Sequence, residues 1–242
     1  MQQDELTVPN APLDKGASAV GFWRTVFAIL GKDLTAEMRS RELLSSMFIF
    51  GVLVILIFNF AFELDVATRQ TVTAGVLWVA FAFSGTLGLN RSMASEKDRA
   101  SFDGLLLAPV DRSAIFFGKM LGNLLFMFIV EGIVIPIYSI LYNTNLFSLG
   151  FLSVVVLGSI GYVSVGTLLA TMAIQTRTRD VMLPILLFPV VIPLLIAAVK
   201  GCMGFLQGLE MDAIRPWLNL LIAYDVIFLA LAWMVFDYLV AE

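Results

Sequence analysis

The longest charged interval of the chain, Ser92–Arg112, separates two apolar stretches and contains the residues best suited to bind a partner. Ser95 can cap the start of a short helix there, and Pro109 disfavours the α conformation of the residue before it, so we expect this helix to end by Ala108. Its apolar side chains recur at the i, i+3, i+4 spacing of one helical face, and they are Phe102, Leu105 and Leu106. Its polar side chains are Glu96, Lys97, Arg99 and Asp103.

Two interpretations of this amphipathic segment stay open. A short amphipathic helix between two membrane spans can lie in the headgroup layer of the bilayer. Alternatively, it can present its apolar face to a groove on a soluble partner protein. The periodicity of the segment does not choose between the two.

Two carboxylates fall inside apolar stretches long enough to cross a bilayer: Glu131 near the middle of one, and Asp225 about two turns into another. An ionised carboxylate is costly in a bilayer and usually faces the interior of a helix bundle. Each residue is therefore a candidate for a substrate path or a proton-linked site. The alternative is a protonated or hydrogen-bonded carboxyl group that only packs helices together, and Asp225 can also face the membrane interface.

The residue inventory excludes most catalytic chemistry. The chain has no histidine and a single cysteine, Cys202, so the commonest ligand for metals and haem iron is missing and no intrachain disulfide can form. No glycine-rich loop leads into Lys-Ser or Lys-Thr, so nucleotide cannot bind through a P-loop. There is also no Ser-His pair and no long basic surface for nucleic acid. We predict a non-enzymatic chain that binds no cofactor or metal and depends on a partner for energy.

Composition predicts a membrane protein. Of the 242 residues, 60% are apolar and 14% are charged, which is far from the usual globular balance. A membrane span needs about 20 predominantly apolar residues. Six stretches are expected to be spans, namely Leu43–Phe62, Val72–Leu89, Ser113–Tyr142, Phe151–Ile174, Val181–Val199 and Leu218–Val240. The predicted fold class is an all-α membrane protein with six transmembrane helices.

The segment before the first span has two parts. Residues 1–20 are polar with few large apolar side chains, which indicates a disordered tail, and residues 21–242 are expected to form the membrane domain. Within residues 21–42, apolar side chains recur at helical spacing, which predicts an amphipathic helix in the membrane interface. These apolar residues are Trp23, Val26, Phe27, Leu30, Leu34 and Met38.

The 15 lysines and arginines are distributed unevenly over the loops. Five precede the first span, five surround the loop after the second span, and two lie between the fourth and fifth spans. The loops on the opposite side contain only Arg69, Lys200 and Arg215. Because positively charged loops stay in the cytoplasm, both termini and Ser92–Arg112 are predicted to be cytoplasmic.

Two spans have unusual compositions. The fifth contains Pro184, Pro189 and Pro193, each of which removes a backbone donor and bends a helix. Such bends can line a cavity, act as pivots or be simple kinks. The fourth span is rich in glycine, serine and threonine, which suits close contact between helices.

The segment Lys200–Pro216, between the fifth and sixth spans, is apolar and contains glycines. This composition predicts a re-entrant or interfacial helical turn.

Four motifs together resemble a known protein family. The run Glu96–Val110, followed by Gly118 and Lys119, resembles the cytoplasmic loop of ABC-2-type (type V) exporter permeases, in which this loop forms a coupling helix on the ATPase subunit. Three further segments narrow the resemblance to the cytochrome c maturation protein B family of haem-exporter permeases, and these are Lys32–Glu42, Leu183–Pro193 and Leu221–Asp225. The similarity covers about residues 22–240.

The resemblance implies a permease subunit of the bacterial inner membrane that lacks an ATPase domain. It implies an ATP-binding partner, maturation protein A, together with maturation proteins C and D and the haem chaperone, maturation protein E. ATP would bind to the partner, and haem would be the substrate. Because six spans make one half of a usual exporter, the resemblance also implies a homodimer.

Site residues follow from the same resemblance. The coupling helix would contact the ATPase through Phe102, Leu105 and Leu106, with Glu96 and Arg99 at the rim of the contact. The N-terminal interfacial motif contributes Asp33, Glu37, Arg39, Arg41 and Glu42. Two alternative functions fit the sequence: an ABC-2 permease for another substrate, such as a lipid or a drug, or a structural subunit that transmits ATP-driven motion without conducting haem.

Overall fold

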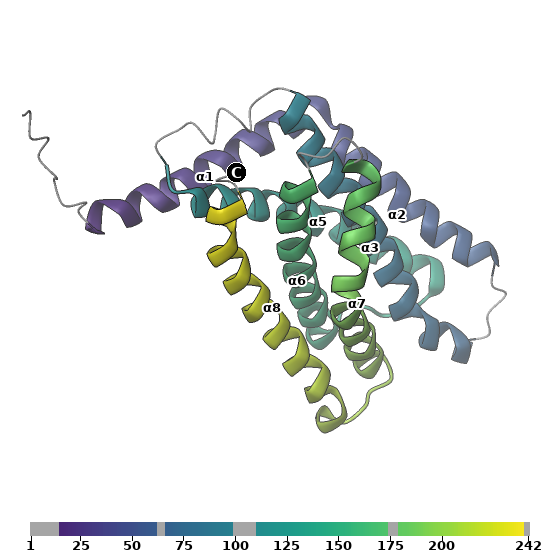
Figure 1. The fold of residues 1–242 in the computed structure, drawn as a ribbon. Helices are drawn as coiled ribbons and strands as arrows, with labels where there is room; N and C mark the ends of the chain where they lie inside the picture. Colours follow the sequence, from purple (N-terminus) through teal and green to yellow (C-terminus); the bar gives the residue numbers. More distant parts are fainter. Residues whose placement is uncertain (1–14, 62–65, 99–109, 174–178, 240–242) are drawn as a thin grey trace, which may run out of the picture.

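The computed structural model describes residues 15–61, 66–98, 110–173 and 179–239, and within these ranges the chain is helical, without strands. The helices keep the labels of Figure 1. They are α1 (Lys15–Ser40), α2 (Glu42–Ala61), α3 (Val66–Asp98), α5 (Arg112–Tyr142), α6 (Leu149–Ala173), α7 (Arg179–Leu206) and α8 (Met211–Leu239). The predicted all-α fold class is therefore confirmed.

Six of these helices contain a segment that is long and apolar enough to cross a membrane. The segments are Glu42–Ala61, Thr71–Glu96, Arg112–Tyr142, Leu149–Ala173, Val181–Leu206 and Met211–Val235. They correspond one to one with the six predicted spans, so the chain is a multi-pass membrane protein. The remaining helix, α1, crosses one end of the bundle (Figure 1).

Helix α1 differs from its prediction at both ends. It begins at Lys15, inside the segment assigned to the disordered tail, and it ends at Ser40. Arg41 then adopts a left-handed conformation with φ of 54°, which breaks the helix before α2 starts at Glu42. The helix can extend back to Lys15 because residues 15–20 contain no proline and include Ala17 and Ala19, since alanine has the highest helix propensity.

Helix α3 also runs further than predicted. It continues past Leu89 to Asp98, so Ser95 lies inside a helix and does not cap the start of a new one. No glycine or proline occurs between Leu89 and Asp98 to stop the helix. The final turns of α3 are held instead by side-chain ion pairs, which sequence pattern does not reveal.

The segment Lys200–Pro216 does not form a re-entrant element, which was one of its two predicted forms. Helix α7 continues to Leu206 and α8 starts at Met211, so only a short turn containing Gly208, with φ of 65°, separates them. Gly204 does not mark a turn, because a Cβ atom there would lie 2.8 Å from Cγ1 of Ile214. Its missing side chain allows the start of α8 to pack against the end of α7.

The spans differ in burial. Helices α3 and α6 are the most buried, and α2 and α8 are the least buried. Helix α7 is continuous through Pro184, Pro189 and Pro193.

Glycines on α6 allow close packing against neighbouring helices. A Cβ atom at Gly158 would collide with the indole ring of Trp78, so only glycine lets the ring lie this close to the α6 backbone. Small residues on α6 therefore create the close contacts that the composition predicted.

We expect Gly158→Ala to lower the free energy of unfolding by about 1–3 kcal/mol, because the added methyl group overlaps a buried ring. Trp78 cannot move aside easily, since it is 2% exposed and its Nε1 donates a hydrogen bond to Cys202 Sγ at 3.4 Å. Thermal unfolding in detergent measures the effect. Gly132→Ala is the control, since nothing lies within 4 Å of its Cβ position. Equal Tm values for Gly158→Ala and wild type would contradict the packing argument.

Candidate functional site

A buried lysine, Lys119, organises the end of the bundle where α1 crosses it. Lys119 lies in the second turn of α5, and its side chain is 2% exposed. Its Nζ donates hydrogen bonds to both carboxylate oxygens of Asp33 in α1, at 2.9 and 2.8 Å. The same Nζ donates to Oε1 of Glu96 in α3, at 2.5 Å. One ammonium group therefore joins three helices.

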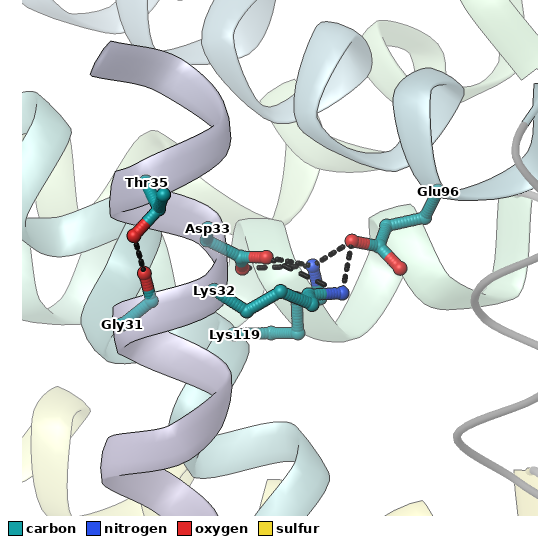
Figure 2. A network of polar contacts seen from close by, with 6 residues as sticks. All are labelled: Gly31, Lys32, Asp33, Thr35, Glu96 and Lys119. Carbon is teal, nitrogen blue, oxygen red and sulfur yellow. Dashed lines mark hydrogen bonds and ion pairs between the residues drawn. The ribbon is translucent and has the colours of Figure 1, made fainter. Parts of the chain in front are cut away.

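A second lysine completes this group. Lys32 Nζ donates to Oε1 of Glu96 at 2.7 Å and lies 3.5 Å from Oδ1 of Asp33. Its side chain is 40% exposed, so it closes the group on the side of the solvent. Figure 2 shows both lysines pointing between the two carboxylates. We call Lys32, Asp33, Glu96 and Lys119 the ion cluster; its two positive and two negative charges balance.

The charge balance explains why the ion cluster is tolerated. Moving an ion out of water costs several kcal/mol, and only a close partner of opposite charge offsets that cost. Lys119 meets this condition with two carboxylates from different helices. The position of α1 is therefore tied to α5 and to the last turns of α3. Gly118 of α5 also allows α1 to approach α5 closely. A Cβ atom at Gly118 would lie 2.9 Å from Cβ of Ile29 in α1, so a larger residue would push the two helices apart.

Glu37 shapes the turn between α1 and α2. Its backbone oxygen accepts a hydrogen bond from the N–H of Arg41 at 2.7 Å, which closes the end of α1. Its side chain Oε1 accepts from the N–H of Leu44 at 2.9 Å, in the first turn of α2. A carboxylate at the start of a helix satisfies an otherwise unpaired N–H and favours the local dipole. Glu37 thus helps to fix the angle between α1 and α2.

A cavity of about 210 Å³, lined by both charged and apolar side chains, lies beside the ion cluster, between α1, α2, α3 and α5. The residues that line it include Glu37, Glu42, Arg91, Ser92, Ser95, Glu96 and Lys119. An exposed ion pair, Arg91 Nη2 to Glu42 Oε2 at 3.0 Å, also joins α3 to α2. At about 30 Å³ per water molecule, the cavity has room for several waters.

The structure brings together only part of the predicted site. Asp33, Glu37 and Glu42 line the cavity, whereas Arg39 and Arg41 are exposed and take no part in the ion cluster. Glu96, predicted at the rim of a partner contact, is 6% exposed and bonded to Lys119 and Lys32. It turns inward because two ammonium groups lie there. The other predicted coupling-helix residues, Arg99, Phe102, Leu105 and Leu106, lie outside the described residues.

Sequence reasoning missed the role of Lys119 and Lys32. Both lysines counted as positive charges near the membrane and as parts of the motifs behind the family resemblance, and neither was expected to form an ion pair. The available signal was the position of Lys119 one turn or more inside an apolar stretch, where a buried lysine requires an acidic partner. The identity of that partner, Asp33, was not readable, because the two residues are 86 positions apart.

The two intramembrane carboxylates lie apart from the ion cluster. Glu131 is 3% exposed, and its Oε1 accepts a hydrogen bond from the Ser159 hydroxyl at 2.5 Å. Asp225 is 6% exposed and lies against Gly161, and neither of its oxygens has a hydrogen-bond partner among the described residues. Both groups face α6, from α5 and α8 respectively. Their roles as substrate-path or proton-linked residues stay predictions.

Comparisons with known proteins agree with this architecture. The family model described as CcmB protein matches residues 24–239. A protein of Pseudomonas aeruginosa named heme exporter protein B is 23% identical to this chain over 196 residues. The aligned region covers 81% of this chain and 88% of that protein. Residues 24–239, which the family model matches, include every member of the ion cluster.

We expect Lys119→Met to reduce the free energy of unfolding by about 3–5 kcal/mol, because it leaves buried negative charge uncompensated. Adding Asp33→Asn should restore part of the loss, since the Lys32–Glu96 pair then stays balanced. Arg91→Gln, which breaks an exposed pair, should cost less than about 1 kcal/mol. Unfolding in detergent measures all three variants. If the double variant is as unstable as Lys119→Met with no recovery, charge balance is not what stabilises this site.

Proposed function

The chain belongs to the CcmB family, and from this we propose that it is the permease subunit of a haem exporter that serves cytochrome c biogenesis. A permease subunit is not itself an enzyme. In this proposal a separate ATPase provides the energy, and its ATP-driven movement enters the permease through the segment after α3. The substrate handled by the assembled complex is haem.

One structural observation carries the coupling part of the proposal. Glu96, in the last turns of α3, bonds to Lys119 of α5 and Lys32 of α1. Residues 99–109, where the coupling helix is expected, follow directly after α3 in the chain. A displacement of that segment therefore acts on α3 and, through the ion cluster, on α1 and α5. The contact with the ATPase would be made by Phe102, Leu105 and Leu106, with Arg99 at its rim.

The proposed partners follow from family membership. They are an ATP-binding subunit (cytochrome c maturation protein A), the membrane subunits maturation proteins C and D, and the haem chaperone maturation protein E. The complex would use ATP hydrolysis either to deliver haem to the chaperone or to release the loaded chaperone. We further propose a homodimer in the bacterial inner membrane with both termini in the cytoplasm, in line with the distribution of lysine and arginine over the loops.

A second candidate is a subunit that transmits motion without conducting haem itself. The hydrogen bonds that some polar groups at the bundle centre make with one another favour it, although both oxygens of Asp225 and Oε2 of Glu131 have no partner among the described residues. The Tyr162 hydroxyl donates to the backbone oxygen of Ala82 at 2.5 Å and lies 2.6 Å from the Thr86 hydroxyl. Glu131 is similarly bonded to Ser159. Under this candidate, haem is handled by another subunit of the complex.

Leu105→Asp should abolish association with the ATPase, because a charge replaces an apolar residue of the proposed contact. Affinity purification of the tagged full-length chain in mild detergent, followed by identification of co-eluting proteins, measures the loss. Leu209→Asp is the matched control, since Leu209 is exposed in the turn between α7 and α8. It should retain the ATPase. Equal recovery of the ATPase by Leu105→Asp and wild type would contradict the coupling-helix contact.

Glu131→Gln should leave cytochrome c assembly close to the wild-type level. Its amide oxygen can accept the same hydrogen bond from Ser159, and the buried position no longer has to accommodate a charge. The measurement is the amount of covalent haem protein in membranes, compared at equal levels of the permease, with Leu105→Asp as the defective reference. Loss of assembly by a stably inserted Glu131→Gln variant would assign a functional role to the carboxylate.

A further inference from the structure

Helix α1 presents three different faces around its circumference. The face toward the bundle contains Val26, Ile29 and Glu37, which are buried, and Asp33, which is largely buried. Asp33 and Glu37 are the carboxylates of this helix, so its negative charge is directed inward. The rest of the circumference is exposed and divides into an apolar part and a basic part.

The exposed apolar part consists of Trp23, Phe27 and Met38, which are 55%, 60% and 70% exposed. At about 100° per residue they fall within an arc of about 60°. The rings of Trp23 and Phe27 lie 6.2 Å apart. Trp23 also contacts Phe22, whose ring lies 6.0 Å from that of Phe117 on α5. These ring contacts connect the apolar arc to Phe117 at the start of α5.

The exposed basic part consists of Arg24, Lys32 and Arg39, within a neighbouring arc of about 80°. All three side chains are on the exposed side of the helix. Lys32 shares the ion cluster, whereas Arg24 and Arg39 form no ion pair within the part of the chain that the structure describes. The side chains between them are small, Ala28 and Thr35. Two guanidinium groups are thus presented without carboxylates on the same face.

We propose that this basic face binds the headgroups of anionic phospholipids in the leaflet on which α1 lies. The two exposed faces decide between a lipid and a protein occupant. An acidic soluble protein would neutralise Arg24 and Arg39 but leave Trp23 and Phe27 in water. A bilayer surface covers both, because the aromatic rings enter the boundary with the acyl chains while the arginines stay at the level of the phosphates. Arg24 and Arg39 are the phosphate-binding residues.

This binding site does not rest on the proposed transport function, because it requires no ATPase and no haem. It adds a constraint on α1 from outside the bundle, whereas the ion cluster constrains the same helix from inside. The lipid composition of the membrane would then bias the position of α1 and, through Asp33, the ion cluster.

The test uses the full-length chain in nanodiscs made from equal amounts of phosphatidylglycerol and phosphatidylcholine with identical acyl chains. Native mass spectrometry then counts the lipids that stay bound after release from the disc. Wild type should retain phosphatidylglycerol in preference to phosphatidylcholine. Arg24→Gln combined with Arg39→Gln should reduce that preference by about 25-fold, which corresponds to about fivefold for each cation near an anionic surface. Arg215→Gln, an exposed arginine in α8, is the matched control and should keep the preference.

Equal phosphatidylglycerol retention by the double variant and wild type would overturn the proposal. So would a double variant that keeps its lipids but no longer co-purifies with the ATPase, because the face would then be a protein-docking surface. A second measurement does not depend on removing arginines. In a Cys202→Ala background, spin labels at Phe27→Cys and Thr35→Cys should be accessible to oxygen and to a water-soluble nickel complex, respectively. The same accessibility at both positions would also overturn the proposal.

Discussion

A buried ammonium group must have negative charge beside it, and much of this structure follows from meeting that requirement at Lys119. Two carboxylates from different helices, Asp33 and Glu96, lie within hydrogen-bond distance of its Nζ. Their positions require α1 to cross the end of the bundle and α3 to extend to its last turn. Lys32 then balances the remaining charge. The cavity beside the cluster and the turn at Glu37 are enclosed by the helices that these ion pairs hold in place.

Two kinds of interaction hold the bundle together in different regions. Near the middle of the spans, α6 packs by close contact, as at Gly158 under Trp78, and such an interface changes only with large displacements. At the end crossed by α1, ion pairs beside a cavity of about 210 Å³ join α1 to α3 and α5. The ion cluster therefore links the end of α3 to α1 and α5, which is the connection that the proposed coupling route requires.

Local pattern was sufficient for much of the fold. The six spans could be predicted because length and hydrophobicity are properties of contiguous residues, and helix α1 could be predicted because its apolar positions repeat every three or four residues. The errors occurred where a helix end depends on tertiary contacts. Helix α3 continues through Ser95 because its end is anchored by Glu96. The segment Lys200–Pro216 is helical at both ends because Gly204 serves a helix contact and not a turn.

The sequence by itself therefore determined the class of protein, the number of spans and, through four motifs, the family. It also supplied each member of the ion cluster within or near those motifs. Only the tertiary structure decided that they belong together and that Glu96 points inward. The physical reason is that a charge pair is set by distance in space, and Lys119 lies 86 positions from Asp33 and 23 from Glu96. No local periodicity encodes such a pairing, whereas hydrophobic length is encoded in every span.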